Sequence, residues 1–148
     1  MYKRIVVAID GSESSTAALT EALRVARAEQ SRLRVIHVID LGSLLVTGAE
    51  GIDLDRLEEA WCATGRRVLE QAGETTKAAA VDAEMALLES SGALRVSDVI
   101  AADAASWQAD LLVVGTRGRH GISHFLLGSV AEGVARTATM PVLLVRHP

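Results

Sequence analysis

LLVVGTRGRHGISHFLLGS, residues 111–129, joins a short apolar run to a segment that holds four glycines. The run at its start, residues 111–114, consists of leucine and valine with no polar residue between them. Strands that are buried on both faces of a parallel sheet have this near-continuous character, whereas half-exposed strands alternate. Similar runs recur along the chain at residues 5–9, 33–39 and 142–145, with a weaker one at 84–88. The sequence therefore predicts five short strands in a parallel sheet.

The segments between these runs have the spacing of helices. In residues 12–30, apolar side chains recur three and four positions apart, and Ser12 precedes them as a candidate N-cap. Three more segments show the same pattern, at residues 53–73, 93–107 and 129–138. Strands that alternate with helices in this way define an open α/β fold with a parallel sheet. We expect one such domain over residues 1–148, with an irregular, mobile loop at 41–53.

Composition and charge narrow the class of partner. The 148 residues are 49% hydrophobic and 23% charged, which is typical of a globular domain and not of a disordered chain. The net charge is −4, and Lys3 and Lys77 are the only lysines, so no basic stripe is present for nucleic acid or an anionic membrane surface. Aromatic residues make up only 3%, which argues against stacking of single-stranded nucleic acid.

Three features of the sequence point to the cytoplasm. The single cysteine, Cys62, cannot form an internal disulfide, as expected in a reducing compartment. No apolar run approaches the roughly 20 residues of a transmembrane helix. The N-terminal stretch MYKRIVVAID has neither the long apolar segment nor the small-residue cleavage site of a signal peptide. We therefore expect a cytoplasmic protein.

Two features fall where an open α/β sheet binds its ligands, at the carboxyl ends of the strands near the point where the strand order reverses. One is Asp10, directly after the first apolar run, and the other is the set of glycines after residue 114. Asp10 could contact a ligand, or it could serve only a turn or a helix cap. The two interpretations stay open at this point.

The glycines fit neither of two common phosphate-binding motifs. A P-loop requires a lysine, which residues 115–129 lack, and the dinucleotide spacing G-x-G-x-x-G is also absent. The observed spacing is G-x-x-G, nine residues, then G-S, from Gly115, Gly118, Gly128 and Ser129. Glycines allow backbone N–H groups to approach a ligand closely, and a helix that opens at Ser129 would favour an anion at its N-terminus. Arg117 at the rim, and Mg²⁺ between phosphates, could add positive charge.

The chain resembles the universal stress protein family in its ATP-binding branch, whose signature is G-x-x-G, nine residues, then G and Ser or Thr. The resemblance covers nearly the whole length, and it includes IVVAIDGSESSTAAL, VIHVID, LLGSVAE and MPVLLVR. It implies a Rossmann-like sheet of the adenine nucleotide alpha hydrolase type, with strand order 3-2-1-4-5 and ATP as the ligand. It also implies a homodimer, which we expect to pair through the edge strand at residues 141–146.

The resemblance further implies which residues would surround ATP. Asp10 would contact the ribose, Ala8 and Ile9 would line the pocket, and Val38 would meet the adenine through its backbone. The remaining positions would lie around the ribose and phosphates: Gly115, Arg117, Gly118, Gly128, Ser129 and Val130.

Other groupings of reactive residues are weaker candidates. His120 and His124 are four residues apart, but no third ligand of fixed spacing follows, so exposed loop histidines are the default interpretation over a metal site. His37, inside an apolar run, is interpreted as a packed histidine. A hydrolase triad of Ser129, a histidine and Asp10 lacks the G-x-S-x-G elbow of such enzymes.

Three functions remain open. The favoured one is a stress-response regulatory protein that binds ATP with slow or no hydrolysis, since the sequence offers no dedicated general base or phosphate-binding lysine. The second is a slow ATPase, or a phosphoryl or nucleotidyl transferase, that uses Asp10 or a loop residue. The third is a dimeric interaction module that binds no nucleotide.

Overall fold

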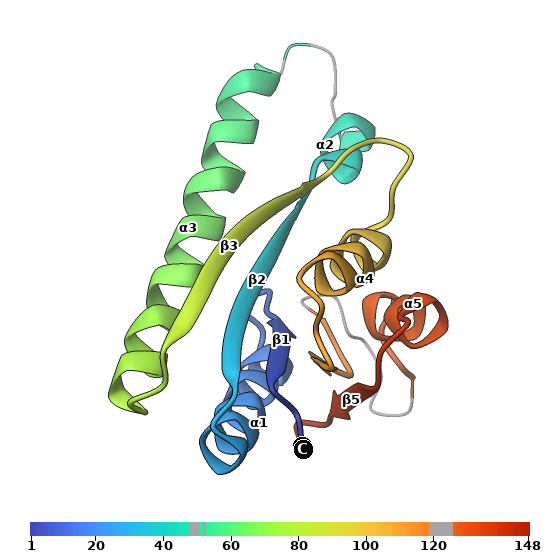
Figure 1. The fold of residues 1–148 in the computed structure, drawn as a ribbon. Helices are drawn as coiled ribbons and strands as arrows, with labels where there is room; N and C mark the ends of the chain where they lie inside the picture. Colours follow the sequence, from blue (N-terminus) through green and yellow to red (C-terminus); the bar gives the residue numbers. More distant parts are fainter. Residues whose placement is uncertain (48–50, 52, 119–125) are drawn as a thin grey trace.

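The computed structural model describes residues 1–47, 51, 53–118 and 126–148. Strands and helices alternate along this part of the chain, except that α2 is followed by a second helix, α3 (Figure 1). The elements are, in order, β1 (Arg4–Ala8), α1 (Glu13–Glu29), β2 (Arg32–Asp40), α2 (Leu41–Thr47), α3 (Leu54–Ala78), β3 (Ala83–Ser90), α4 (Val96–Ser106), β4 (Leu111–Gly115), α5 (Ser129–Thr137) and β5 (Val142–Val145).

The five strands form one parallel sheet in the order β3-β2-β1-β4-β5. The chain winds outward from β1 to β3 on one side of the sheet and from β4 to β5 on the other. The strand order therefore reverses between β1 and β4, where residues 5–8 pair with residues 111–114. This confirms the predicted α/β fold and the strand order 3-2-1-4-5, and it places the ligand-binding end of such a sheet at the carboxyl ends of β1 and β4.

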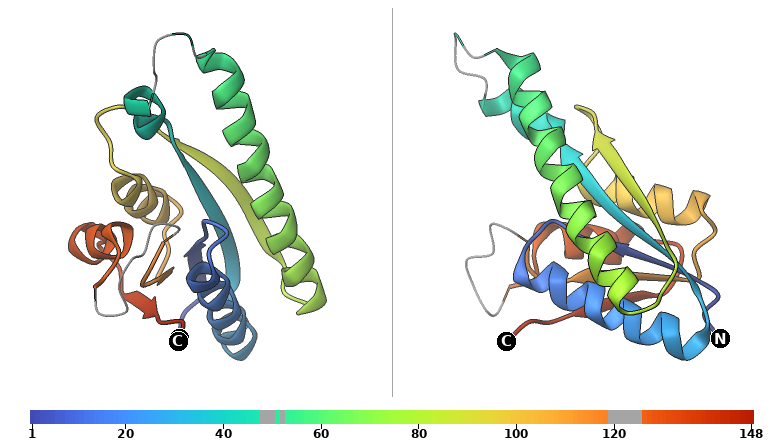
Figure 2. Two further views of the ribbon diagram at one scale, coloured as in Figure 1. Left: turned by 180° about the vertical axis from the view of Figure 1, so that it is seen from behind. Right: turned by 90° about the vertical axis from the view of Figure 1, so that its left-hand side faces the viewer.

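Helices cover both faces of the sheet, α1 and α3 on one and α4 and α5 on the other (Figures 1 and 2). Successive residues of the central strands enter opposite cores. Val7 and Val113 face α1 and α3, whereas Val6 and Leu112 face α4 and α5. All four side chains are fully buried. Burial on both faces explains why the strand sequences show no alternation of polar and apolar residues.

The segment 41–53 was expected as an irregular loop, but it begins with the short helix α2. The Asp40 carboxylate accepts hydrogen bonds from the Ser43 N–H at 3.1 Å and from the Ser43 hydroxyl at 2.5 Å. These bonds satisfy a backbone donor at the start of α2 and favour a helix over a loop. The prediction was therefore wrong for residues 41–47, and residues 48–50 and 52 lie outside the described part of the chain.

β2 and β3 extend past the end of β1. The pairing of β1 with β2 ends at Ala8 and Ile36, whereas the pairing of β2 with β3 continues to Asp40 and Ser90. α2 and the first half of α3 accompany this extension, so the β2–β3 side of the molecule projects beyond the carboxyl end of β1 (Figure 2). Residues at the end of β2 thus border the region where the strand order reverses.

Candidate functional site

Asp10 lies directly after β1 and serves the turn into α1. Its carboxylate oxygen Oδ1 accepts a hydrogen bond from the Ser12 N–H at 2.9 Å, and its own N–H donates to the Ser15 hydroxyl at 3.2 Å. The other carboxylate oxygen, Oδ2, lies 3.1 Å from the point that a Cβ on Gly118 would occupy. One oxygen of Asp10 therefore holds the turn, while the other faces Gly118. We call residues 115–129, which contain Gly118, the glycine segment. The turn role is confirmed, and it leaves the ligand role compatible with the geometry.

Close packing explains why glycine occupies position 115, and the spacing of the motif alone does not reveal this reason. A Cβ at this position would lie 2.7 Å from the backbone carbon and oxygen of Ser14, which cannot move aside without shifting α1. The N-terminus of α1 therefore packs directly on the end of β4. The Ser14 hydroxyl also accepts a hydrogen bond from the Arg117 N–H at 3.2 Å. These contacts hold the first residues after β4 against the turn that carries Asp10.

The two ends of the glycine segment meet. The Gly128 N–H donates to the Thr116 carbonyl at 2.7 Å, and a Cβ on Gly128 would lie 3.5 Å from the Gly118 nitrogen. The Thr116 N–H in turn donates to the Val145 carbonyl at 2.9 Å, which fastens this closure to β5. The spacing of G-x-x-G and G-S therefore brings Gly118 and Gly128 together in space. Residues 119–125, which include His120 and His124, lie outside the described residues.

The start of α5 presents backbone N–H groups beside this closure. Gly128 is its N-cap, and no side-chain cap is formed at this end of the described helix. The first helical hydrogen bond runs from the Glu132 N–H to the Gly128 carbonyl at 2.9 Å, so the N–H groups of residues 129–131 precede the helical ladder. The Glu132 carboxylate is paired with Arg136 at 2.6 Å. Exposed Ser129 adds a hydroxyl to an N-terminus of the kind that favours anions.

The Arg117 side chain reaches the C-terminal segment. Its Nη2 donates a hydrogen bond to the His147 carbonyl, beyond the end of β5. His147 lies 3.8 Å from the Glu13 carboxylate, so the C-terminal segment also contacts the first turn of α1. The structure thus brings the Arg117 backbone to the candidate site and directs a guanidinium hydrogen bond to the C-terminal segment.

The remaining predicted positions divide between the two faces of the sheet. Ala8, Val38 and Val130 all pack on the core shared with α4 and α5. Ile9 packs on the opposite core, with only 7% of its surface exposed. The Ile9 carbonyl lies 2.7 Å from Nδ1 of His37. Sequence reasoning placed His37 among the packed histidines, and nothing in the spacing pointed to this contact between strands.

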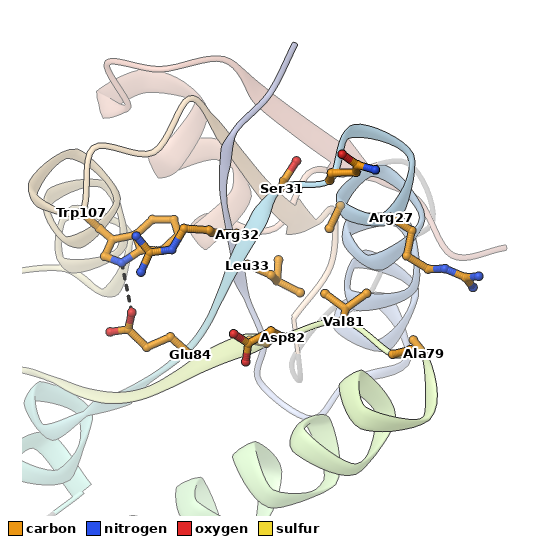
Figure 3. A pocket seen from close by; sticks show the side chains of 13 residues that line it. Arg27, Ser31, Arg32, Leu33, Ala79, Val81, Asp82, Glu84 and Trp107 are labelled. Carbon is orange, nitrogen blue, oxygen red and sulfur yellow. Dashed lines mark hydrogen bonds between the residues drawn. The ribbon is translucent and has the colours of Figure 1, made fainter.

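A cavity of about 560 Å³ lies at the other end of the sheet, among the C-terminal ends of α1 and α3 and the first residues of β2 and β3 (Figure 3). Its charged and aromatic groups contact one another. The Trp107 Nε1–H donates to Glu84 at 3.2 Å, and the Arg32 guanidinium lies 5.9 Å from the centre of the Trp107 ring. These contacts join strands to α4 at the amino ends of the strands. We therefore interpret the cavity as a structural feature, and we place the candidate site at the carboxyl ends of the strands.

The described residues contain neither a metal-binding cluster nor a membrane-spanning helix. Among residues 1–47, 51, 53–118 and 126–148, no group of three or more His, Cys, Asp and Glu side chains is arranged to hold a metal ion. In the same part of the chain, no helix combines the length and the apolar character needed to cross a membrane. Cys62 is partly buried on α3.

The fold and the candidate site together define an open α/β protein with a parallel sheet. The two ends of its glycine segment meet near β1 and β4, where the strand order reverses. The sequence pattern of the universal stress protein family matches residues 1–146, and the chain belongs to this family. A universal stress protein of Methanocaldococcus jannaschii is 32% identical over 148 residues, which cover 100% of this chain and 84% of the relative.

Two solved structures show the same fold. A universal stress protein in complex with cAMP is 30% identical, with a TM-score of 0.71 and 97% of each chain covered. The universal stress protein of Archaeoglobus fulgidus in complex with dAMP is 26% identical, with a TM-score of 0.67, and covers 97% of this chain and 98% of its own.

Proposed function

We propose that this protein binds an adenine nucleotide, with ATP as the physiological ligand, and acts in the stress response by binding rather than by rapid hydrolysis. The observation that carries the proposal is a chain of neighbours at the strand-order reversal. Asp10 Oδ2 approaches Gly118, Gly118 approaches Gly128, and Gly128 opens α5 without a side-chain cap. A carboxylate suited to ribose hydroxyls thus lies beside a helix N-terminus suited to phosphate. The cAMP and dAMP complexes of two similar structures support the same ligand class.

In this proposal the predicted residues divide by the part of the nucleotide that they contact. The Val38 backbone meets the adenine, and Ala8 and Ile9 line the pocket beside it. Asp10 accepts hydrogen bonds from the ribose. The phosphates lie at the glycine segment and the start of α5, among Gly115, Arg117, Gly118, Gly128, Ser129 and Val130. Mg²⁺, where present, would bridge phosphate oxygens and offset their charge.

Binding without rapid turnover follows from what residues 115–129 contain. They include no lysine, so no ammonium group is supplied there to stabilise charge on a transferred phosphoryl group. An interaction that is equal in the ground state and the transition state gives affinity without rate. A slow ATPase or a phosphoryl or nucleotidyl transferase is the second candidate function, because Asp10 lies close enough to the glycine segment to orient a water molecule or a hydroxyl group.

We further propose that the protein is a homodimer and lies in the cytoplasm. A homodimer would form through residues 141–146, because β5 is an edge strand and Leu144 keeps 36% of its surface exposed. Residues 1–148 would act as one domain in the cytoplasm, with no nucleic acid or membrane partner. A dimer that binds no nucleotide would instead be an interaction module, the third candidate function.

Calorimetric titration with ATP, AMP and cAMP tests the proposal, with Gly118→Ala as the variant. The added Cβ would lie 3.1 Å from Asp10 Oδ2, within the space assigned to the ribose, and a carboxylate can yield by the few tenths of an ångström that folding needs. We expect affinity to fall at least about tenfold, equivalent to roughly 1.4 kcal/mol, with unchanged thermal unfolding.

Gly73→Ala is the matched control, because its Cβ would meet Met85 Cε, at 4.0 Å, and no other described residue within that distance. It should bind nucleotide as the wild type does. Absence of adenine-nucleotide binding by the wild type would refute the proposal. Release of ADP or of a transfer product by the wild type but not by Gly118→Ala would favour the enzymatic alternative.

A further inference from the structure

The His37 imidazole joins the ends of two strands at the candidate site. Its Nδ1 lies 2.7 Å from the Ile9 carbonyl oxygen. Because a carbonyl oxygen only accepts, Nδ1 carries the proton and donates it. Ile9 immediately precedes Asp10, and His37 immediately precedes Val38. The hydrogen bond therefore connects the residues next to the proposed ribose contact and the proposed adenine contact.

This bond lies where the backbone ladder between β1 and β2 runs out. The Ile9 N–H donates to the Ile36 carbonyl at 2.9 Å, one residue beyond the end of β1. At the next step along the chain, the His37 side chain supplies the contact to the Ile9 carbonyl. Alternate residues of a parallel strand direct their backbone groups to opposite neighbours. Since Ile36 faces β1, Val38 also directs its N–H and C=O toward that side, past the end of β1 and toward the candidate site.

Helix α3 provides the space that the imidazole occupies. Gly65 is buried in the middle of α3, and a Cβ there would lie 2.9 Å from His37 Cδ2 and 2.8 Å from Leu87 Cδ1. Glycine in a helix interior costs about 1 kcal/mol relative to alanine, so a close neighbour is the physical reason for its presence. The ring is thus held between α3 and the Ile9 carbonyl, which restricts it to one orientation.

We propose that His37 is a positioning residue of the nucleotide site, which fixes the Ile9–Asp10 backbone against β2. Its hydrogen bond holds the Asp10 carboxylate and the Val38 backbone at the separation that a nucleoside requires between ribose and base. His37 itself touches no ligand. The inference rests on the proposed nucleotide-binding function and adds to it a residue that acts through its neighbours.

Three substitutions separate this role from packing. In His37→Asn, the side-chain amide nitrogen falls near the place of Nδ1 and can donate to the Ile9 carbonyl. In His37→Gln the amide reaches instead toward the place of Nε2, and His37→Leu has no donor. We expect His37→Asn to bind ATP close to the wild-type affinity. His37→Gln and His37→Leu should lose up to about tenfold, the range of one hydrogen bond.

The second measurement uses the ligand-free protein. Nitrogen NMR should show His37 protonated at Nδ1, and the amide resonance of Asp10 should move in His37→Gln and His37→Leu but stay in place in His37→Asn. Rescue by asparagine alone distinguishes a positioned hydrogen bond from packing, because asparagine is the smallest of the three replacements and leaves the most space unfilled.

Two outcomes overturn the inference in different ways. Wild-type affinity in His37→Gln, or equal loss in His37→Asn and His37→Leu, would refute the positioning role while the wild type still binds nucleotide. A wild-type protein that binds no adenine nucleotide would refute the proposed function and the role of His37 with it.

Discussion

Helix α3 contains two glycines, Gly65 and Gly73, whose surroundings differ. Gly65 is buried, and a side chain there would meet His37 and Leu87 at less than 3 Å. Gly73, two turns further along, would place a Cβ in ordinary contact with Met85. Gly65 therefore makes room for a neighbour, whereas at Gly73 no contact with the described part of the chain excludes alanine.

We predict opposite effects of alanine at these two positions. Gly65→Ala should lower the free energy of unfolding by about 1–3 kcal/mol, because overpacking outweighs the gain in helix propensity. Gly73→Ala should raise it by up to about 1 kcal/mol, since alanine has less conformational freedom to lose. Urea denaturation of both variants measures the difference. Equal stabilisation by the two substitutions would show that His37 and Leu87 do not fill the space beside Gly65.

The glycines of the candidate site also differ in what a substitution would report. At Gly115 the obstacle is the Ser14 backbone at 2.7 Å, so alanine would disturb the packing of α1 on β4. At Gly118 the obstacle is the Asp10 carboxylate at 3.1 Å, a side-chain group that can shift. Loss of binding in a Gly118 variant therefore reports on the site, whereas loss in a Gly115 variant would mix binding with folding.

The polar cluster between β2 and α4 depends on one arginine, Arg34. The Arg34 guanidinium donates to both carboxylate oxygens of Asp103, at 3.0 and 2.9 Å, and also pairs with Glu84. The hydrogen bonds with Asp103 raise the pKa of Arg34 above its usual range. Arg34 therefore stays charged at physiological pH, and it depends on its carboxylate partners.

Asp103→Asn should lower the free energy of unfolding by about 1–3 kcal/mol, because the Arg34 side chain, only 14% exposed, loses a charged acceptor and keeps its own charge. The matched control is Glu59→Gln on the exposed surface of α3, which should change stability by no more than about 0.5 kcal/mol. Chemical denaturation of both variants gives the comparison. A neutral Asp103→Asn would mean that Glu84 alone satisfies Arg34.

The strands could be predicted because burial on both faces leaves a direct record in the sequence. Val6 and Val7 enter different cores, so a polar residue at either position would be buried. α2 could not be predicted in this way, because its start depends on the Asp40–Ser43 hydrogen bonds and not on an apolar stripe. The candidate site could likewise be predicted only in part. The glycine spacing could be read from the sequence, but the approach of Asp10 to Gly118 and of His37 to Ile9 depends on strand register.

The topology leaves β5 paired on one side, with β4, and this edge leads to the prediction for the whole assembly. Wild-type protein should scatter light as a dimer, with about twice the 15.6 kDa mass of one chain, at micromolar concentration. Leu144→Lys should give monomers, because a charged side chain at a sheet edge opposes pairing with a second strand. Leu94→Lys, at an exposed position outside the sheet, should leave the dimer intact.

The same variant separates two of the candidate functions. The hydrogen bond that fastens the glycine segment to β5 joins the Thr116 N–H to the Val145 carbonyl, so it uses backbone atoms that Leu144→Lys does not change. A monomeric variant should therefore bind ATP with near wild-type affinity if nucleotide binding is a property of each chain. Loss of ATP binding together with dimerisation would show that the site is completed by the second copy. A wild type that is monomeric at micromolar concentration would contradict pairing through residues 141–146.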